Sequence, residues 1–497
     1  GTYSHPIDDW ALIETHISWV VLAGEFGYKF KKPIKTPFLD YSSLELRRIA
    51  CLEELRLNRR YAPEIYLDVV CILDAGDHLK VASQDESMNK RVVEYAVRMH
   101  RFEDQRLLSD LLRNGRLTGH QIELLADELA EVHLTAPEAI PGSLWGSPEE
   151  LEKESRDNFQ ELREISGSRF EDSLTAIERW DAETFHRLHS VWHSRRLEGH
   201  IKECHGDLHL GNLVWHKQRV ALFDAIEFNE AFRWIDTMSD LAFVLMDLED
   251  RGRIDFAGRL LNRYLEKTGD YDGLEVLDWY MVYRAMVRAK VAAIRANQET
   301  SADRADEDWL RVEEYIDWAK RMSHSREVGL AITYGLSGSG KTVGTEPLLM
   351  TGRAIRVRSD IERRREPELV SILDGTEPKS VPESASGSTV GQGLYRPSHV
   401  EATYQRMLRV AQTILESGYW AIIDATFLEA KNRDSFARLA RDLKLPFHIL
   451  AFDADMQTLS SRIEKRRAEG TDPSEATTEV LRAQQKNMQP LSDREKT

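Results

Sequence analysis

The segment that most constrains how this chain folds is 335–342, which lies between an apolar run and a predicted helix. It matches G-x-x-x-x-G-K-[ST], a loop whose backbone N–H groups curl around phosphate oxygens. In such a loop Lys341 reaches the outer phosphates and the Thr342 hydroxyl binds Mg²⁺. A glycine-rich turn without nucleotide is the alternative, but a strand at 331–334 disfavours it. The residues expected to contact nucleotide are Gly335, Ser337, Gly338, Ser339, Gly340, Lys341 and Thr342.

Strands and helices alternate after this loop. Apolar runs at 354–357, 420–423 and 446–452 have the length of strands and are separated by helical patterns. This alternation predicts a parallel sheet covered by helices. We therefore expect an α/β P-loop domain at 326–497, with a loop rich in Ser, Gly, Pro and Glu at 374–398.

Two carboxylates follow predicted strands of this region. Asp360 comes after the strand at 354–357, and Asp424 ends the apolar run at 421–423. Either residue alone is as easily a helix cap or a surface residue. Their joint placement favours a functional pair, in which Asp424 acts with Thr342 as a ligand for the metal.

Basic residues recur on a later predicted helix. Arg462, Arg466 and Arg467 stand at positions i, i+4 and i+5, on one side of that helix. We expect either a lid, in which Arg462 and Arg466 contact the nucleotide, or an ordinary solvated helix face.

This region resembles the small P-loop kinases, namely gluconate kinase, the zeta-toxin kinases and the kinase domain of polynucleotide kinases. The resemblance covers about 170 residues and is carried by the loop at 335–342, the Asp-x-x-Arg of Asp360 to Arg363, and the segment 424–427. It implies that Asp360 is the base that takes the proton from the acceptor hydroxyl. It also implies that Arg363 binds the substrate or a phosphate.

A second motif lies at 205–212 and reads His-Gly-Asp-Leu-His-Leu-Gly-Asn. Asp224 follows Asn212 by twelve residues, at the end of a short apolar run. The spacing predicts that Asp207 orients and deprotonates a hydroxyl, while Asn212 and Asp224 hold Mg²⁺. A turn without chemistry is the alternative, and the joint spacing disfavours it.

The second motif resembles the catalytic loop of the aminoglycoside phosphotransferase family, which shares the protein-kinase fold. The resemblance covers residues 1–325. It implies an α+β bilobal domain, with an N-lobe at about 1–100 and a helical C-lobe at about 101–325. Asp240 matches a family position that is structural. The order of the two regions also resembles a bacterial arrangement that fuses such a domain to a P-loop kinase.

The N-lobe match is weaker. Strand periodicity puts Lys29 and Lys31 on one face, and one of them is expected to contact the α- and β-phosphates. We favour Lys31, with Glu54 as its helix partner and Glu53 as second choice. A solvated edge strand is the alternative. No G-x-G-x-x-G precedes this strand, so the turn 15–18 is the expected cover for the phosphates.

The composition narrows the class of protein. The formal net charge is −17, and the part before residue 329 carries all of it, which argues against broad nucleic-acid binding by that part. We find no membrane-spanning run and no signal segment, and only three cysteines without a C-x-x-C pair. These features predict a cytoplasmic protein with no membrane partner. The sequence does not indicate its oligomeric state.

Three hypotheses follow for function. The first is a bifunctional kinase that uses ATP (or GTP) and Mg²⁺ in each domain to phosphorylate a hydroxyl of a small molecule, such as a sugar, nucleoside or aminocyclitol. The second keeps one kinase and makes the other domain a nucleotide-dependent regulator. The third, which we do not favour, makes the C-terminal domain a nucleic-acid 5′-hydroxyl kinase.

Overall fold

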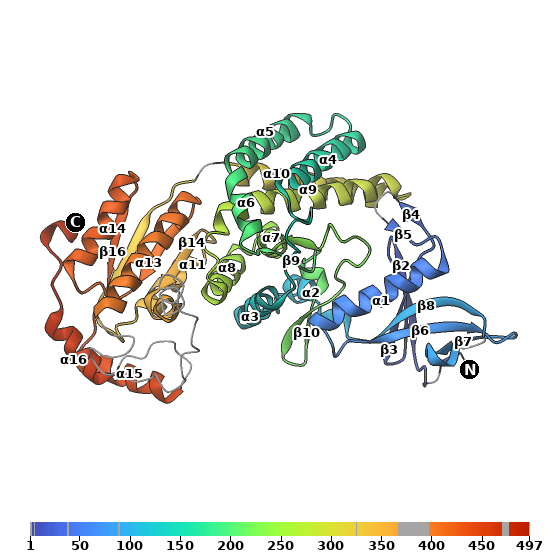
Figure 1. Ribbon diagram of the computed structural model, residues 1–497, viewed down its shortest axis with the longest axis horizontal. Helices are drawn as coiled ribbons and strands as arrows, with labels where there is room; N and C mark the ends of the chain where they lie inside the picture. The colour runs from blue at the N-terminus through green and yellow to red at the C-terminus, as the bar shows by residue number, and fades with distance from the viewer. Residues whose placement is uncertain are drawn as a thin grey trace. The chain divides into compact units, whose positions relative to one another are not determined.

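A computed structural model describes residues 2–3, 5–36, 39–87, 90–324, 326–365, 397–469 and 477–496. These residues form two compact units. The first unit comprises Gly1–Arg251 and Trp279–Met322, and the second comprises Gly252–Asp278 and Ser323–Thr497. In Figure 1 the chain runs from blue at the N-terminus to red at the C-terminus.

The first unit begins with a six-stranded antiparallel sheet in the order β1-β2-β3-β8-β6-β7. Gly24 makes the turn between β2 and β3 at a φ of 59°, and a Cβ there would lie 2.6 Å from the Pro6 carbonyl oxygen. The strands are β1 (Trp10–Glu14), β2 (Ser18–Ala23), β3 (Phe26–Lys31), β6 (Tyr66–Asp74), β7 (Leu79–Ala82) and β8 (Val92–His100), with a small pair β4 (Lys35–Thr36) and β5 (Leu39–Asp40) beside them in sequence.

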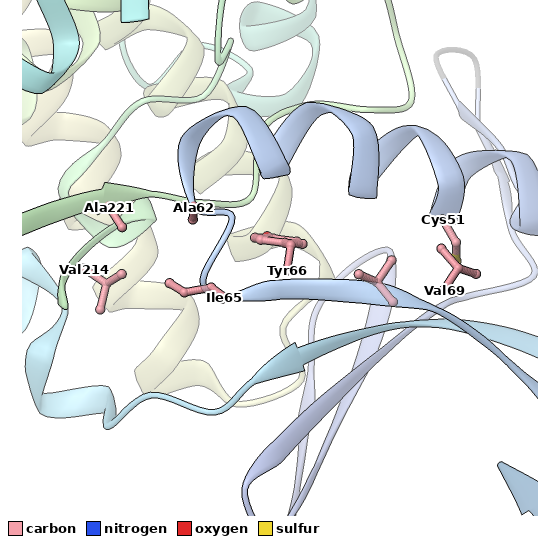
Figure 2. Close-up of a cluster of buried hydrophobic side chains, with 8 residues drawn as sticks. Cys51, Ala62, Ile65, Tyr66, Val69, Val214 and Ala221 are labelled. Atoms are coloured by element: carbon pink, nitrogen blue, oxygen red, sulfur yellow. The ribbon is translucent and has the colours of Figure 1, made fainter. Parts of the chain in front are cut away.

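One long helix, α1 (Leu44–Tyr61), packs on this sheet through β6 and β8. Its N-terminus is capped by Ser43, whose side chain accepts a hydrogen bond from the Leu46 N–H. A buried apolar cluster holds α1 to β6 and β8 and reaches two strands further along the chain (Figure 2). Its members are Cys51, Ala62, Ile65, Tyr66, Val69, Val97, Val214 and Ala221.

The rest of the first unit is mainly helical, as predicted. Its helices are α2 (Leu108–Arg113), α3 (Gly119–Thr135), α4 (Pro148–Ser166), α5 (Glu171–Arg187), α6 (His189–Leu197), α7 (Thr237–Asp250), α10 (Ala302–Met322) and most of α9 (Leu274–Gln298). Two antiparallel pairs lie between α6 and α7 in sequence: β9 (Ile201–Glu203) with β12 (Trp234–Asp236), and β10 (Leu213–His216) with β11 (Arg219–Leu222). Among the described residues, no helix is both long enough and apolar enough to cross a membrane.

The second unit contains the predicted parallel sheet, with four strands in the order β14-β15-β13-β16. The strands are β13 (Leu330–Tyr334), β14 (Ala354–Arg358), β15 (Trp420–Asp424) and β16 (Phe447–Ala451). The helices that alternate with them are α11 (Lys341–Leu349), α13 (Pro397–Glu416), α14 (Ala430–Asp442), α15 (Met456–Glu469) and α16 (Thr478–Asn487). Of the predicted loop 374–398, residues 374–396 lie outside the described residues, and the last two open α13.

The second unit also includes α8 (Ile254–Thr268), which comes well before the predicted boundary at 325/326. In Figure 1 this helix lies beside α11, and it packs on β14 as well. The division of the chain into domains at 325/326 stays a prediction. No pattern in the sequence predicted that a segment from the region before this boundary packs with the P-loop sheet.

Candidate active sites

The motif at 205–212 forms a tight loop in the first unit. The side-chain amide of Asn212 donates to the Asp207 carbonyl oxygen at 2.9 Å and to Asp207 Oδ2 at 3.3 Å. The Asp207 side chain is 39% exposed, so its carboxylate is accessible from solvent. The predicted base and one predicted metal ligand therefore lie side by side.

Helix α7 fixes this loop through two buried carboxylates. Asp240 accepts hydrogen bonds from the backbone N–H groups of His205 at 3.0 Å and Gly206 at 2.9 Å, and Asp247 accepts one from Leu210 at 2.9 Å. Burial by itself raises the pKa of Asp240, but His133 beside it holds that pKa below its usual value. Asp240 thus has the structural position that the family resemblance implies. Asp247 was not predicted, although it lies two helical turns further on the same face.

Asp224 lies just after β11, with a φ of 64°. Its backbone N–H donates to the Tyr66 hydroxyl at 3.0 Å, and the next N–H, that of Ala225, donates to Asn58 Oδ1 at 2.9 Å. Partial burial raises the pKa of the Asp224 carboxyl, but the charge of Lys29 beside it holds the pKa below its usual value. The carboxylate is therefore fixed in its charged form.

Lys29 and Lys31 both reach Glu54 on α1. The Lys29 Nζ lies 2.9 Å from Glu54 Oε1 and also binds Asp224, while the Lys31 Nζ lies 2.5 Å from Glu54 Oε2 and also binds Glu227. The Lys31 side chain is fully buried. Our preference for Lys31 as the phosphate-binding lysine is not supported by this geometry, because Lys29 is the lysine beside the predicted metal ligand.

Two further glutamates near this lysine pair have different partners. Glu53, the second-choice partner, faces away and pairs with Arg56 and Arg233. Sequence reasoning missed Glu227, which also accepts from the Tyr41 hydroxyl. Its only signal in the sequence was its place three residues after Asp224.

The expected cover for the phosphates, residues 15–18, is a tight turn between β1 and β2. The Thr15 N–H donates to the Ser18 carbonyl oxygen at 2.9 Å, and the Ser18 N–H donates to Thr15 Oγ1 at 2.9 Å. Two N–H groups of the turn are therefore bonded within the turn itself.

In the second unit the phosphate loop connects β13 to α11, as predicted. Gly335, Gly338 and Gly340 have φ values of 144°, 85° and 94°, which disfavour any side chain. A Cβ at Gly335 would also lie 2.2 Å from the Phe452 carbonyl oxygen. The Ser339 hydroxyl is buried and has no hydrogen-bond partner among the described residues. A cradle that excludes side chains and holds a spare donor suits a phosphate group.

Lys341 and Thr342 make the contacts within the phosphate loop and with Asp424 that follow. The Lys341 Nζ donates to the carbonyl oxygens of Gly335 at 3.1 Å and Leu336 at 2.9 Å, and burial lowers the pKa of this lysine. Thr342 Oγ1 donates to Asp424 Oδ2 at 2.6 Å. The two predicted metal ligands of the second unit are therefore neighbours.

A cavity of about 1010 Å³ opens from the phosphate loop. Asp360 and Arg363 line it, and their side chains lie 3.6 Å apart. Arg462 donates to the Gly338 carbonyl oxygen at 3.1 Å, and Arg466 lines the same cavity. Apart from Gly335, the predicted site residues of this unit thus line one cavity. Ser337 belongs to it too, and its N–H donates to Gln484 on α16 at 3.0 Å, a contact that the sequence did not predict.

Both sites offer oxygen ligands that suit Mg²⁺. The first pairs the Asn212 amide with the Asp224 carboxylate, and the second pairs the Thr342 hydroxyl with the Asp424 carboxylate. Hard oxygen donors of this kind, few in number, are typical of magnesium sites that are completed by phosphates and water. The residues present therefore fit the ion.

Two protein families match the two regions of the chain. The Phosphotransferase enzyme family matches residues 51–280, and the AAA domain family matches residues 330–491. Among solved structures, a choline kinase from Cryptosporidium parvum is 13% identical with a TM-score of 0.39, covering 63% of this chain and 89% of that one. An ethanolamine kinase from Plasmodium vivax is 11% identical with a TM-score of 0.38, covering 62% and 81%.

Relatives match the chain over both regions. Uncharacterized proteins of Mycobacterium tuberculosis and Mycobacterium bovis are 30% identical over 492 residues, which is 97% of this chain and 92% of each relative. The two resemblances drawn from the motifs are confirmed. The chain belongs to the same family as these mycobacterial proteins, and it is a kinase with a phosphotransferase-family region, a P-loop region and a hydroxyl acceptor.

Proposed function

We propose that the chain is a bifunctional phosphotransferase, in which each unit transfers a γ-phosphoryl group from ATP (or GTP) to a hydroxyl of a small molecule. One observation carries this proposal: each unit brings a base candidate, two metal-ligand candidates and a lysine together. Bound nucleotide supplies the γ-phosphoryl group, and Mg²⁺ neutralises the charge on its phosphates.

In the first unit Asp207 accepts the proton of the acceptor hydroxyl as its oxygen attacks the γ-phosphorus. The bond to the bridging oxygen breaks, and the nucleoside diphosphate leaves with the electron pair. Asn212 and Asp224 hold the metal, and Lys29, oriented by Glu54, contacts the phosphates.

In the second unit Asp360 accepts the proton and Arg363 binds the acceptor. Thr342 and Asp424 hold the metal. The phosphates lie in the glycine cradle and are contacted by Lys341, Arg462 and Arg466. Cationic groups fixed around the transferred phosphoryl group stabilise the charge that spreads over it in the transition state.

One observation favours an alternative for the first unit. The turn 15–18 is short and internally hydrogen-bonded, and no G-x-G-x-x-G precedes β3 in the sequence. A first unit that grips nucleotide weakly would act as a regulator of the second.

The experiment uses the full chain, γ-labelled ATP and a cell metabolite extract. Asp207→Asn and Lys341→Met are compared with the exposed controls Asp77→Asn and Lys431→Met. The proposal expects two labelled products, each lost in one variant and retained in the other. If one substitution removes every product and the other alters only the rate, the chain has one kinase site and the regulator alternative holds.

We further propose a cytoplasmic setting. It is supported by the three cysteines, Cys51, Cys71 and Cys204, which are all buried and free of disulfides. Nucleic-acid binding is not favoured for the part of the chain before residue 329, which carries the negative net charge.

A further inference from the structure

Helix α8 is built into the second unit by its contacts with the edge strand β14. The Asn262 side chain donates to the Ala354 carbonyl oxygen at 2.9 Å and accepts from the Arg356 N–H at 2.8 Å. It thereby satisfies two backbone groups on that edge. Gly258, one turn earlier, lies so close to α11 that a Cβ would stand 2.1 Å from the Leu349 carbonyl oxygen.

The C-terminal end of α8 lies at the end of β14 that leads into the site. There the Glu266 carbonyl oxygen accepts a hydrogen bond from Arg365 at 2.7 Å. The Tyr271 hydroxyl donates to Glu362 at 3.3 Å. In the sheet register Arg358, the last residue of β14, lies opposite Asp424. Helix α8 therefore runs along β14 towards the carboxyl ends of the strands, where ligands of α/β sheets bind.

Arg263 follows Asn262 directly and lines the cavity of the phosphate loop. The two hydrogen bonds of Asn262 fix the backbone from which the Arg263 side chain extends. Arg358 and Arg363 line the same cavity, next to Asp360. Three guanidinium groups thus line the same cavity as the predicted base. Lys341, Arg462 and Arg466 already serve the phosphate loop.

We propose that the acceptor of the second site carries an anionic group, a phosphate or a carboxylate, and that Arg263 binds it together with Arg358 and Arg363. The inference rests on the proposed kinase activity of that site and names its substrate class. A guanidinium group stays charged at all physiological pH values and presents a planar fork that matches both kinds of anion. Arg263 is then a residue that determines specificity, supplied from within the region that the phosphotransferase family matches.

The test measures anion binding by the full chain. Isothermal titration with inorganic phosphate, and separately with acetate, is performed on protein saturated with Mg²⁺ and a non-hydrolysable ATP analogue, so that the phosphate loop is filled. Arg263→Ala and Arg263→Lys are compared with Arg259→Ala. Arg259 lies one turn earlier on α8, pairs with Glu346 at 3.3 Å and does not line the cavity.

We expect Arg263→Ala to weaken phosphate binding by about tenfold, which equals about 1.4 kcal/mol. Arg263→Lys should lose part of this affinity, because it keeps the charge without the fork. Arg259→Ala and the nucleotide affinity should not change. An effect on acetate rather than on phosphate assigns the anion as a carboxylate.

Unchanged binding of both anions in Arg263→Ala, with nucleotide bound, contradicts the proposal. The kinase proposal is contradicted by a different result, namely that the ATP analogue binds the Lys341→Met variant as tightly as the unmodified protein. The two failures are therefore distinguishable in the same titrations.

Discussion

Lys29 and Lys31 stand two residues apart on β3, yet they have different surroundings. Lys31 is enclosed by Glu54 and Glu227, with no exposed side-chain surface, whereas Lys29 bridges Glu54 to Asp224. Strand periodicity predicted that both lysines share a face, and the family resemblance suggested Glu54 as the partner. Periodicity could not rank the lysines, because Glu227 lies 196 residues away from Lys31 in sequence.

This difference predicts opposite effects for two substitutions. Lys29→Met should lower the first-site rate by about 10²- to 10³-fold with little loss of stability, since it removes a group that contacts phosphate. Lys31→Met leaves the buried Glu227 carboxylate without its cation, whereas Glu54 keeps Lys29, and it should cost about 3–5 kcal/mol of unfolding free energy. Urea unfolding and nucleotide titration check both. A stable Lys31→Met protein that has lost its nucleotide affinity reverses the assignment.

A buried acid in the helical part of the first unit gives a pH prediction. Burial raises the pKa of Asp181 to about 7, and Ser155 donates to its carboxylate at 3.0 Å. An acid whose folded pKa is raised binds more protons when folded, so its contribution to stability falls as the pH rises from about 4 to 7.

Asp181→Asn has the shape of the protonated aspartate but does not titrate, so it should remove this decrease in stability with rising pH. At pH 8 the variant should therefore be more stable by up to about 4 kcal/mol. Denaturant unfolding of both proteins at pH 5 and pH 8 measures the difference, and other titrating groups cancel between them. An equal stability difference at the two pH values contradicts the raised pKa.

At the scale of elements, the sequence pattern predicted a strand, loop or helix well wherever the residues of that element alone determine it. The strand, loop and helix at 330–349 and the strand that ends at Asp424 follow from runs of apolar residues and glycines in order. The clamp that α7 places on the catalytic loop does not, because its two carboxylates read as ordinary residues of an apolar helix. Only the fold shows that they accept backbone N–H groups from 205–210.

This clamp predicts an effect on the first site alone. An amide at position 240 has one acceptor oxygen where the carboxylate has two, so Asp240→Asn leaves a buried N–H unsatisfied, at a cost of about 1–3 kcal/mol. The first-site product should decrease while the second-site product persists. Glu249→Gln, on the same helix, is the control, and an equal loss of both products argues against a local clamp.

At the scale of the whole molecule, the predicted domain boundary at 325/326 rests on a change in the pattern of strands and helices. Helix α8 precedes this boundary in sequence, although it packs on the parallel sheet that follows it. Periodicity shows that a helix has an apolar face, but it does not show which neighbour receives that face. The parallel sheet was predictable because its strands follow one another in sequence. The docking of α8 on β14 brings residue 262 into contact with residues 354–356. A contact between residues so far apart in sequence cannot be predicted from the local sequence pattern.

A fragment cut at the predicted boundary tests this docking. Residues 326–497 alone leave the Ala354 carbonyl and the Arg356 N–H of β14 without Asn262, and an open strand edge promotes aggregation. We expect this fragment to be less soluble and to bind a fluorescent ATP analogue more weakly than 323–497 joined by a Gly/Ser linker to 252–278. The linked fragment with Asn262→Ala should lose about 1–3 kcal/mol per unsatisfied group in thermal unfolding. If 326–497 alone is monomeric and binds the analogue as the full chain does, α8 is dispensable for the second unit.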